Sequence, residues 1–388
     1  MKIYHFHNGT GGGVLSVIRN LLLYKQHECI ENHVIYTINK EQKKDFKAFG
    51  LAGAASEQVF YYSPKWNFYY TCKKLASLLA NDSSVIVAHD WLELGMASNL
   101  GLQNPVIQVL HGDFDYYYEL SEKNKAGIDE FICVSPVIAS KLRNVLTHFK
   151  DHISYIKFPI QEIKLNKTQD SPFTAIYFVR DLTEQRKQFH KIPIIHEALL
   201  KKNIHIRWII AGGGVTKEDF PVIWGNHLQH VTFYGSVPNN EILKLLSQAS
   251  IMVLPSLMEG FPVAVAESMK CGVVPLITDW GKATAELVIE GETGFLFDKN
   301  DIDGYVSTIE KLVNHPMLLA GLSKRAIEVS NYLFDPYKNT FQYEEIFIRA
   351  MGKIKRKKSI KIYGSRLDHI LIPNKFTCLA RKFLAWLP

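Results

Sequence analysis

The chain has 388 residues, of which 47% are apolar, and a formal net charge of +7 from 45 Lys or Arg against 38 Asp or Glu. This length favours two domains, because domains typically hold about 100–200 residues. No apolar run approaches the roughly 18 residues of a membrane span, and the opening MKIYHFHNG lacks the pattern of a secretory signal.

The positive charge is concentrated at the C-terminus. Residues 351–388 hold ten Lys or Arg and one acidic residue, Asp368, whereas the other 350 residues hold 35 Lys or Arg and 37 Asp or Glu. A mildly acidic body argues against a nucleic-acid-binding protein, which would spread basic residues over a groove. The five cysteines are scattered, odd in number and without C-x-x-C spacing, so we expect reduced thiols in the cytosol and no structural zinc site.

The first half alternates short apolar runs with helical patterns, which predicts a parallel sheet covered on both faces. A strand at Lys2–Phe6, a glycine-rich loop over 7–13 and a helix over 14–24 open it as a nucleotide-binding fold opens. The dinucleotide fingerprint G-x-G-x-x-G would need glycine at Val14, which disfavours a dehydrogenase. The further predicted strands are Val34–Ile38, Val85–Ala88, Val106–Leu110, Glu130–Val134 and Tyr155–Phe158.

Two of these strands end in polar groups, His89-Asp90-Trp91 and His111-Gly112-Asp113. Ligands of open α/β sheets bind beyond the carboxyl ends of the strands, so both groups are placed for function. A lone buried histidine is more often structural, and that alternative stays open for each. The run Phe114–Tyr118 predicts an aromatic loop over the acceptor side, or a packing element.

The second half follows a polar, proline-bounded linker over 159–172. It opens with a strand at Phe173–Val179 and a charged loop that contains Arg180, Arg186 and Lys187. These cations could bind an anionic ligand or form a solvated face. Further strands are predicted at Ile204–Ile210 and Val231–Tyr234.

The most informative stretch runs from Ile251 to Phe297. It predicts a buried strand at Ile251–Leu254, a helix over 262–270 with proline at its first position, and a strand at Val273–Ile277. Glu259 then precedes the helix and Glu267 lies inside it, roughly 7.5 Å along the axis at 1.5 Å per residue. Carboxylates accept hydrogen bonds from sugar hydroxyls, and a helix N-terminus attracts phosphate.

The pattern PS-x-x-EGFP-x-x-x-x-E-x-M-x-x-G over 255–272 resembles glycosyltransferase family 4, a retaining family of GT-B type. The resemblance implies a GT-B fold, which is an α/β architecture of two Rossmann-like domains facing a cleft. It also implies transfer of a hexosyl group from a nucleoside diphosphate sugar to an acceptor hydroxyl with retention. In the family the first glutamate lies by the donor sugar and the second usually holds the ribose, roles that fall here to Glu259 and Glu267.

The resemblance also implies catalytic and donor-binding roles for further residues of this sequence. His111, followed by glycine, matches a histidine near the reacting sugar, so the predicted catalytic residues are Glu259, His111 and Arg186. Alignment on Leu182 puts Asp181 where the family has arginine and Arg186 where it has lysine, which leaves catalytic competence in question. The predicted donor-binding residues are Arg180, Lys187, Gly12, Gly13, Gly260, Phe261, Val263, Ala264 and Glu267.

These cations and the helix N-terminus can stabilise the leaving diphosphate, so we expect no cofactor and no metal requirement. The expected partners are a nucleotide sugar and a glycan or lipid-linked acceptor, as in cell-envelope polysaccharide or lipopolysaccharide synthesis. Two alternatives remain: another GT-B enzyme (a sugar-nucleotide epimerase or a phosphorylase), or a non-catalytic binding protein.

The predicted domains are an acceptor-side domain over 1–165, a donor domain over 172–335, a helix over 336–351 that crosses back, and a basic amphipathic tail over 352–388. Seven basic residues lie between Lys353 and Arg366 without an acid, and apolar residues then recur at helical spacing from Phe376 to Leu387. The two signals together predict reversible docking of a cytoplasmic enzyme on the anionic inner face of the cell membrane. The alternative is that the apolar stripe packs onto the first domain.

Overall fold

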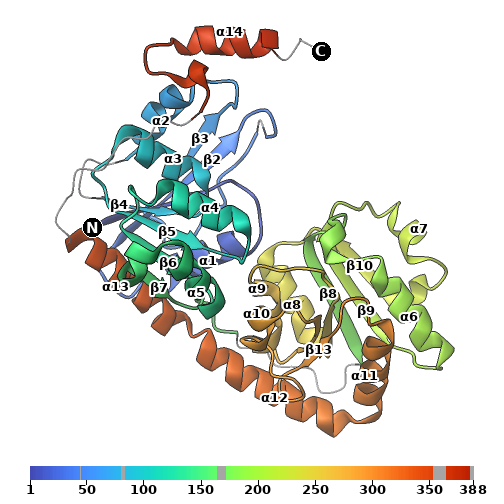
Figure 1. The fold of residues 1–388 in the computed structure, drawn as a ribbon. Helices are drawn as coiled ribbons and strands as arrows, with labels where there is room; N and C mark the ends of the chain where they lie inside the picture. The colour runs from blue at the N-terminus through green and yellow to red at the C-terminus, as the bar shows by residue number, and fades with distance from the viewer. Residues whose placement is uncertain (44, 80–83, 164–171, 353–363, 385–388) are drawn as a thin grey trace. The chain divides into compact units, whose positions relative to one another are not determined.

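The computed structural model describes residues 1–43, 45–79, 84–163, 172–352 and 364–384. The chain divides into two compact units, one made of Met1–Pro159 with Pro336–Pro388 and the other of Ile160–Asp335. Each unit is built on its own parallel sheet with helices around it (Figure 1), which confirms the predicted α/β class. The division falls at the start of the polar segment 159–172, of which residues 164–171 lie outside the described part.

The first unit has a seven-stranded sheet with the order β3-β2-β1-β4-β5-β6-β7, and every neighbouring pair is parallel. Strands β4, β5 and β6 are buried along their whole length, as expected for strands covered on both faces. The strands are β1 Lys2–His7, β2 Glu31–Asn39, β3 Ser56–Tyr62, β4 Ser84–Ala88, β5 Val106–Leu110, β6 Glu130–Cys133 and β7 Ile153–Tyr155.

Five helices of the first unit connect these strands, and two of them have clear start signals. Helix α3 begins at a capping box in which Asp90 and Glu93 satisfy the first free N–H groups, and α5 begins with Ser135 as its cap and a proline in its first turn. The helices are α1 Gly13–Leu23, α2 Phe68–Ala76, α3 Trp91–Leu100, α4 Asp115–Asn124 and α5 Pro136–Val145, with a 3₁₀ turn at Thr147–His152.

Two predicted elements of this unit need correction. The segment Phe114–Tyr118 is the start of helix α4 and not a loop, because Asp115 supplies the acidic first turn that stabilises a helix N-terminus. The last strand is Ile153–Tyr155 and not Tyr155–Phe158, because the pairing of β6 with β7 ends at Cys133 and Tyr155.

The second unit has a six-stranded parallel sheet with the order β10-β9-β8-β11-β12-β13. The strands are β8 Thr174–Asp181, β9 Arg207–Gly213, β10 Val231–Gly235, β11 Ile251–Leu254, β12 Val274–Thr278 and β13 Phe295–Phe297. The helices are α6 Lys191–Lys201, α7 Phe220–Trp224, α8 Asn239–Gln248, α9 Val263–Lys270, α10 Lys282–Ala285, α11 Ile302–Asn314 and α12 Pro316–Leu333, with 3₁₀ turns at Gln185–Lys187 and Leu228–His230.

Helix α13, Pro336–Gly352, belongs to the first unit, as the predicted crossing helix requires. The Glu344 carboxylate accepts hydrogen bonds from the Gln26 and His27 N–H groups at 3.1 and 2.9 Å, and Arg349 pairs with the buried Glu130 at 2.8 Å. These contacts fix α13 to the end of α1 and to β6.

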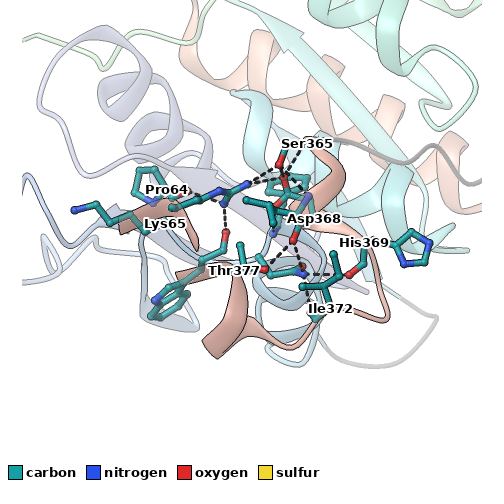
Figure 2. Close-up of polar contacts among 12 residues, drawn as sticks. Pro64, Lys65, Ser365, Asp368, His369, Ile372 and Thr377 are labelled. Carbon is teal, nitrogen blue, oxygen red and sulfur yellow. Dashed lines mark hydrogen bonds and ion pairs between the residues drawn. The ribbon is translucent and has the colours of Figure 1, made fainter. Parts of the chain in front are cut away.

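The described part of the tail consists of a 3₁₀ turn at Arg366–Asp368 and helix α14, Asn374–Leu384. It docks onto the N-terminus of α2 through polar groups (Figure 2). Asn67 Nδ2 lies 3.0–3.1 Å from three tail carbonyl oxygens, and the Phe68 N–H donates to Asp368 at 2.7 Å. The polybasic residues 353–363 and the end of the predicted apolar stripe, 385–388, lie outside the described residues.

The apolar face of α14 is open to solvent. Phe376, Leu379 and Phe383 are 57%, 66% and 70% exposed and recur at the spacing of one helix face. The alternative in which this stripe packs onto the first domain is therefore wrong for the described part of the tail. Among the described helices, none combines the length and apolar character that crossing a bilayer demands.

Candidate functional site

Both sheets reverse their strand order at one point, and several of the predicted site residues follow the strands at these points. In the first unit the reversal lies between β1 and β4, and in the second between β8 and β11. Open α/β sheets bind ligands beyond the carboxyl ends of strands at such points. The loops concerned contain Gly9–Gly13 and His89 in the first unit and Arg180–Lys187 and Glu259 in the second.

In the second unit the predicted cations gather around two carboxylates. Lys187 Nζ lies 2.7 and 2.8 Å from the two oxygens of Glu259, and Arg186 lies 3.5 Å from the same carboxylate. Arg186 and Arg180 also pair with Glu184 at 2.7 and 2.6 Å. The Glu259 side chain is only 6% exposed, whereas Arg180 and Arg186 are 54% and 44% exposed. The cluster thus holds three cations and two anions, and the two guanidinium groups keep access to solvent.

The backbone around these cations is held in place by its neighbours. The Leu257 N–H donates to the Arg186 carbonyl oxygen at 2.8 Å, which joins the β8 loop to the β11 loop. The Tyr177 hydroxyl donates to the Lys187 carbonyl oxygen at 2.9 Å. Burial, together with the charge of Glu259, raises the pKa of Tyr177, so this hydroxyl stays a donor. These hydrogen bonds fix the backbone of Arg186 and Lys187, from which the two cationic side chains extend.

Asp181, which stands where the resembling family has arginine, has a structural role. Its Oδ1 accepts hydrogen bonds from the Thr183 N–H and hydroxyl at 2.9 and 2.6 Å, which folds the loop back after β8. These hydrogen bonds lower the pKa of Asp181. The same oxygen would lie 2.1 Å from a Cβ at Gly214, whose φ is +84°, so the neighbouring loop needs glycine there. This turn lies between Arg180 and Arg186, which both pair with the Glu184 carboxylate.

The loop that enters α9 supplies backbone groups. The helix begins at Val263, one residue after the predicted start, with Pro262 as its cap. The Val263 N–H donates to the Phe261 carbonyl oxygen at 2.9 Å, so this predicted phosphate donor is already engaged within the loop. The Val265 N–H bonds to Pro262, which leaves Ala264 as the first-turn N–H without a backbone acceptor in the described chain. Gly260 and Phe261 connect this helix start to Glu259.

Glu267 lies in the second turn of α9 and is 5% exposed. It lies within α9, whereas Glu259 lies in the loop that precedes the helix, so the two glutamates of the motif hold different positions. The first faces the cations and the second is recessed along the helix.

Sequence reasoning missed two contributors to this region. Glu184 joins Arg180 to Arg186, and its position four residues after Arg180 was the available signal. The Trp280 indole N–H donates to the Ser256 carbonyl oxygen at 2.7 Å, which ties the loop after β12 to the loop after β11. The Ser256 hydroxyl is fully buried and makes no hydrogen bond within the described structure.

The first unit contributes the glycine-rich loop. Gly12 caps α1 with φ +116° and Gly13 is its first residue, and both are exposed beyond the end of β1. Gly9 has φ +71°, a conformation that favours glycine, and a Cβ there would displace the end of the Ile38 side chain. The predicted loop thus has exposed backbone at a helix N-terminus.

His111 belongs to a buried group of histidines. Its Nε2 lies 2.7 Å from His89 Nδ1, which joins the ends of β4 and β5, and His5 and His7 lie nearby on β1. Burial lowers the pKa of His5 and of His7 to about 4 and that of His111 to about 3, and it lowers the pKa of His89 as well. The His89–His111 pair is therefore neutral near pH 7, with one ring donating to the other.

Glu93 lies beside this group and accepts the His89 and Asp90 N–H groups at 2.8 and 2.7 Å. Burial raises the pKa of Glu93 to about 8, which exceeds the opposing effect of these hydrogen bonds. Asp90 is itself held by the Tyr116 hydroxyl from α4. A buried acid thus aligns the backbone that positions His89.

The histidine pKa values predict loss of stability in mild acid. The unfolded chain takes up protons near pH 6.5, whereas folded His5, His7 and His111 take them up only at about 4, 4 and 3. The unfolded state therefore gains protons first, and stability falls as the pH drops from about 6.5 to about 4. The raised pKa of Glu93 has the opposite effect and increases stability as the pH falls from about 8 to 4.5. Glu93 is a single group, however, so the three histidines dominate the change in stability.

Denaturant unfolding at a series of pH values tests this expectation. His111→Gln should flatten the acid limb of the stability curve, and His148→Gln, at an exposed position of the same unit, should leave it unchanged. Equal slopes in the two variants would contradict the assignment of the acid limb to the buried group.

Comparisons with known proteins relate both the second unit and the whole fold to glycosyltransferases. Residues 160–329 match the model of the family described as "Glycosyl transferases group 1", a range that corresponds to the second unit. An uncharacterized glycosyltransferase, MJ1178 of Methanocaldococcus jannaschii, is 26% identical over 215 residues, which are 55% of this chain and 57% of that protein. The D-rhamnosyltransferase WbpZ of Pseudomonas aeruginosa is 21% identical over 350 residues, 84% of this chain and 90% of that protein.

The fold is that of known glycosyltransferase structures. HepE of Anabaena, solved with UDP and glucose, superposes with a TM-score of 0.68 and 17% identity over 90% of this chain and all of that chain. The chain therefore has the GT-B fold. In contrast to WbpZ and HepE, which are covered almost completely, MJ1178 is matched over little more than half of its length.

Proposed function

We propose that this chain is a retaining glycosyltransferase that moves a hexosyl group from a nucleoside diphosphate sugar to an acceptor hydroxyl. The observation that carries the proposal is the cluster of Arg180, Arg186 and Lys187 with Glu259 at the carboxyl ends of β8 and β11. It lies in the unit that matches the glycosyltransferase model. HepE, which shares the fold, was solved with UDP and glucose, so a UDP-hexose is the first donor to test.

The donor diphosphate is the anion that this cluster fits. Arg186 and Lys187 make ion pairs with Glu259 and Glu184, and a diphosphate can take the place of these carboxylates as their partner. The exposed guanidinium of Arg180 and the Ala264 N–H add two further donors. Together they stabilise the negative charge that develops on the leaving diphosphate.

The two glutamates then act on hydroxyl groups. Glu259, beside the cations, accepts hydrogen bonds from the donor sugar, and Glu267 accepts them from the ribose. In this assignment both carboxylates bind hydroxyl groups, and neither has the acid or nucleophile role of a glycosidase carboxylate. The diphosphate departs and the acceptor hydroxyl attacks from the same face, with the neutral His111 near the reacting sugar.

The acceptor is a glycan or a lipid-linked glycan of the cell envelope. WbpZ, a D-rhamnosyltransferase, and the lipopolysaccharide outer core galactosyltransferase WaaB, which shares the fold, support this class. The enzyme works on the cytoplasmic face of the membrane. The exposed apolar face of α14, with Lys375 and Lys382 on the same helix, supports docking on an anionic lipid surface.

Glu267→Ala is expected to weaken UDP binding by about 10–150-fold, because a charge-assisted hydrogen bond contributes about 1.5–3 kcal/mol. Calorimetric titration with UDP measures the change. Glu241→Ala, at a surface carboxylate of the same unit, is the matched control and should bind UDP normally. Unchanged affinity in the Glu267 variant would remove the ribose assignment.

Activity is expected to survive EDTA, because side-chain cations and a helix N-terminus supply the charge opposite the diphosphate. Donor turnover with and without chelator measures this. Loss of turnover in EDTA and recovery with Mg²⁺ or Mn²⁺ would show that a divalent ion carries the role assigned to Arg186 and Lys187.

A further inference from the structure

The first unit contains a pocket of about 500 Å³ between its body and the C-terminal tail. Five aromatic side chains contribute to its walls: Tyr62, Trp66, Phe68, Trp91 and Tyr116. Pockets of this size and composition bind small organic groups through their apolar surface. Neither the donor cluster nor the histidine group uses these side chains.

The aromatic walls are held in fixed orientations. Phe68 and Trp91 stack with ring centroids 5.6 Å apart and planes 21° apart, and Tyr62 meets the edge of Trp91 at 6.5 Å. Lys40 Nζ lies over the Trp66 ring, 4.5 Å from its centroid. The pocket is thus formed before any ligand arrives, which lowers the entropic cost of binding.

The tail supplies the remaining wall through Gly364, Asp368 and Arg381. Figure 2 shows the polar contacts that hold it: Arg381 donates to the carbonyl oxygens of Pro64 and Trp66, and to Asp368 at 2.6 Å. Arg381 and Asp368 therefore make hydrogen bonds that hold the tail in place. The surface offered to a ligand is therefore mostly apolar, and Glu119 and Lys123 are the other charged residues that line it.

The position of the pocket relates it to the acceptor. Trp91 directly follows Asp90 at the end of β4, and the Tyr116 hydroxyl donates to that same Asp90. The pocket is therefore next to the strand end that carries the His89–His111 pair. On its other side is the tail whose helix α14 exposes Phe376, Leu379 and Phe383.

We propose that this pocket binds the apolar chain, isoprenoid or acyl, of a lipid-linked acceptor. The inference rests on the proposed function for the identity of the acceptor, but the binding of the chain is a separate property. The tail then has two roles: its exposed face meets the lipid surface, and its inner side completes the site that receives a single chain from it.

The test uses the full chain and 11-(dansylamino)undecanoic acid, whose dansyl fluorescence reports binding without donor or turnover. We expect saturable binding, and the double variant Trp66→Phe, Trp91→Phe should bind similarly while energy transfer from tryptophan to dansyl falls. Trp91→Gln should weaken binding by at least about tenfold, because a polar amide replaces an aromatic ring that lines the pocket. Tyr234→Gln, at a position as exposed as Trp91 but in the second unit, should bind normally.

Equal affinity in the Trp91 and Tyr234 variants, or unchanged energy transfer in the double phenylalanine variant, would overturn the proposal. Displacement of the probe by maltose would also overturn it, in favour of a sugar-stacking site. UDP titration of the Trp91→Gln variant separates the two proposals: normal UDP affinity with lost probe binding shows that the chain site has failed and the donor site has not.

Discussion

Glu259→Gln is expected to lower donor turnover by about 10–150-fold while UDP affinity stays near that of the parent chain. The Glu259 carboxylate is almost fully buried and lies against Lys187 and Arg186. It is assigned to the donor sugar, which UDP lacks, and a charge-assisted hydrogen bond contributes about 1.5–3 kcal/mol. Removing its charge also frees Lys187 for the diphosphate, so UDP affinity has no reason to fall.

Lys187→Met gives the opposite pattern and serves as the paired measurement. It removes a cation assigned to the diphosphate, so UDP affinity should fall in calorimetric titration. A Glu259 variant that loses UDP affinity as strongly as the Lys187 variant would show that Glu259 acts only by positioning Lys187.

Leu379→Asp is expected to reduce co-sedimentation with anionic vesicles by about tenfold or more without changing stability. Leu379 is 66% exposed on α14, so the folded chain loses little packing, whereas burying a leucine side chain in lipid is worth about 1.5–3 kcal/mol. Met317→Asp, at an 84% exposed position of the second unit, is the matched control. Equal vesicle binding by both variants and the parent chain would contradict membrane docking through α14 and leave the donor site untouched.

Elements built from uninterrupted apolar runs could be predicted from the sequence. Strands β5 and β11 coincide with their predicted bounds, because both are fully buried and end at clear polar breaks. Strand β3, Ser56–Tyr62, was missed because it lies at the sheet edge, most of its residues are only half-buried, and its first three residues are polar. Helix α12, Pro316–Leu333, was missed as well: only three of its residues are buried, so its apolar pattern is weak.

The site was partly predictable for a similar reason. Neighbouring parallel strands end at the same edge, so the topology alone brings His89 and His111 together. The Glu184 bridge and the turn made by Asp181 depend on side-chain geometry that spacing does not reveal. The docking of the tail depends on Asn67 and Asp368, which are about 300 positions apart and carry no local pattern that links them.

The most direct test of the account is proton NMR of the sugar released when the full chain is incubated with α-linked UDP-glucose, UDP-N-acetylglucosamine or GDP-mannose. A retaining transferase hydrolyses its donor slowly in the absence of acceptor, and the account predicts that one donor releases its sugar first as the α anomer. The same signal should be strongly reduced in Glu259→Gln. Initial appearance of the β anomer would contradict retention, and no release from any donor, together with no UDP or GDP binding by calorimetry, would contradict the transferase assignment itself.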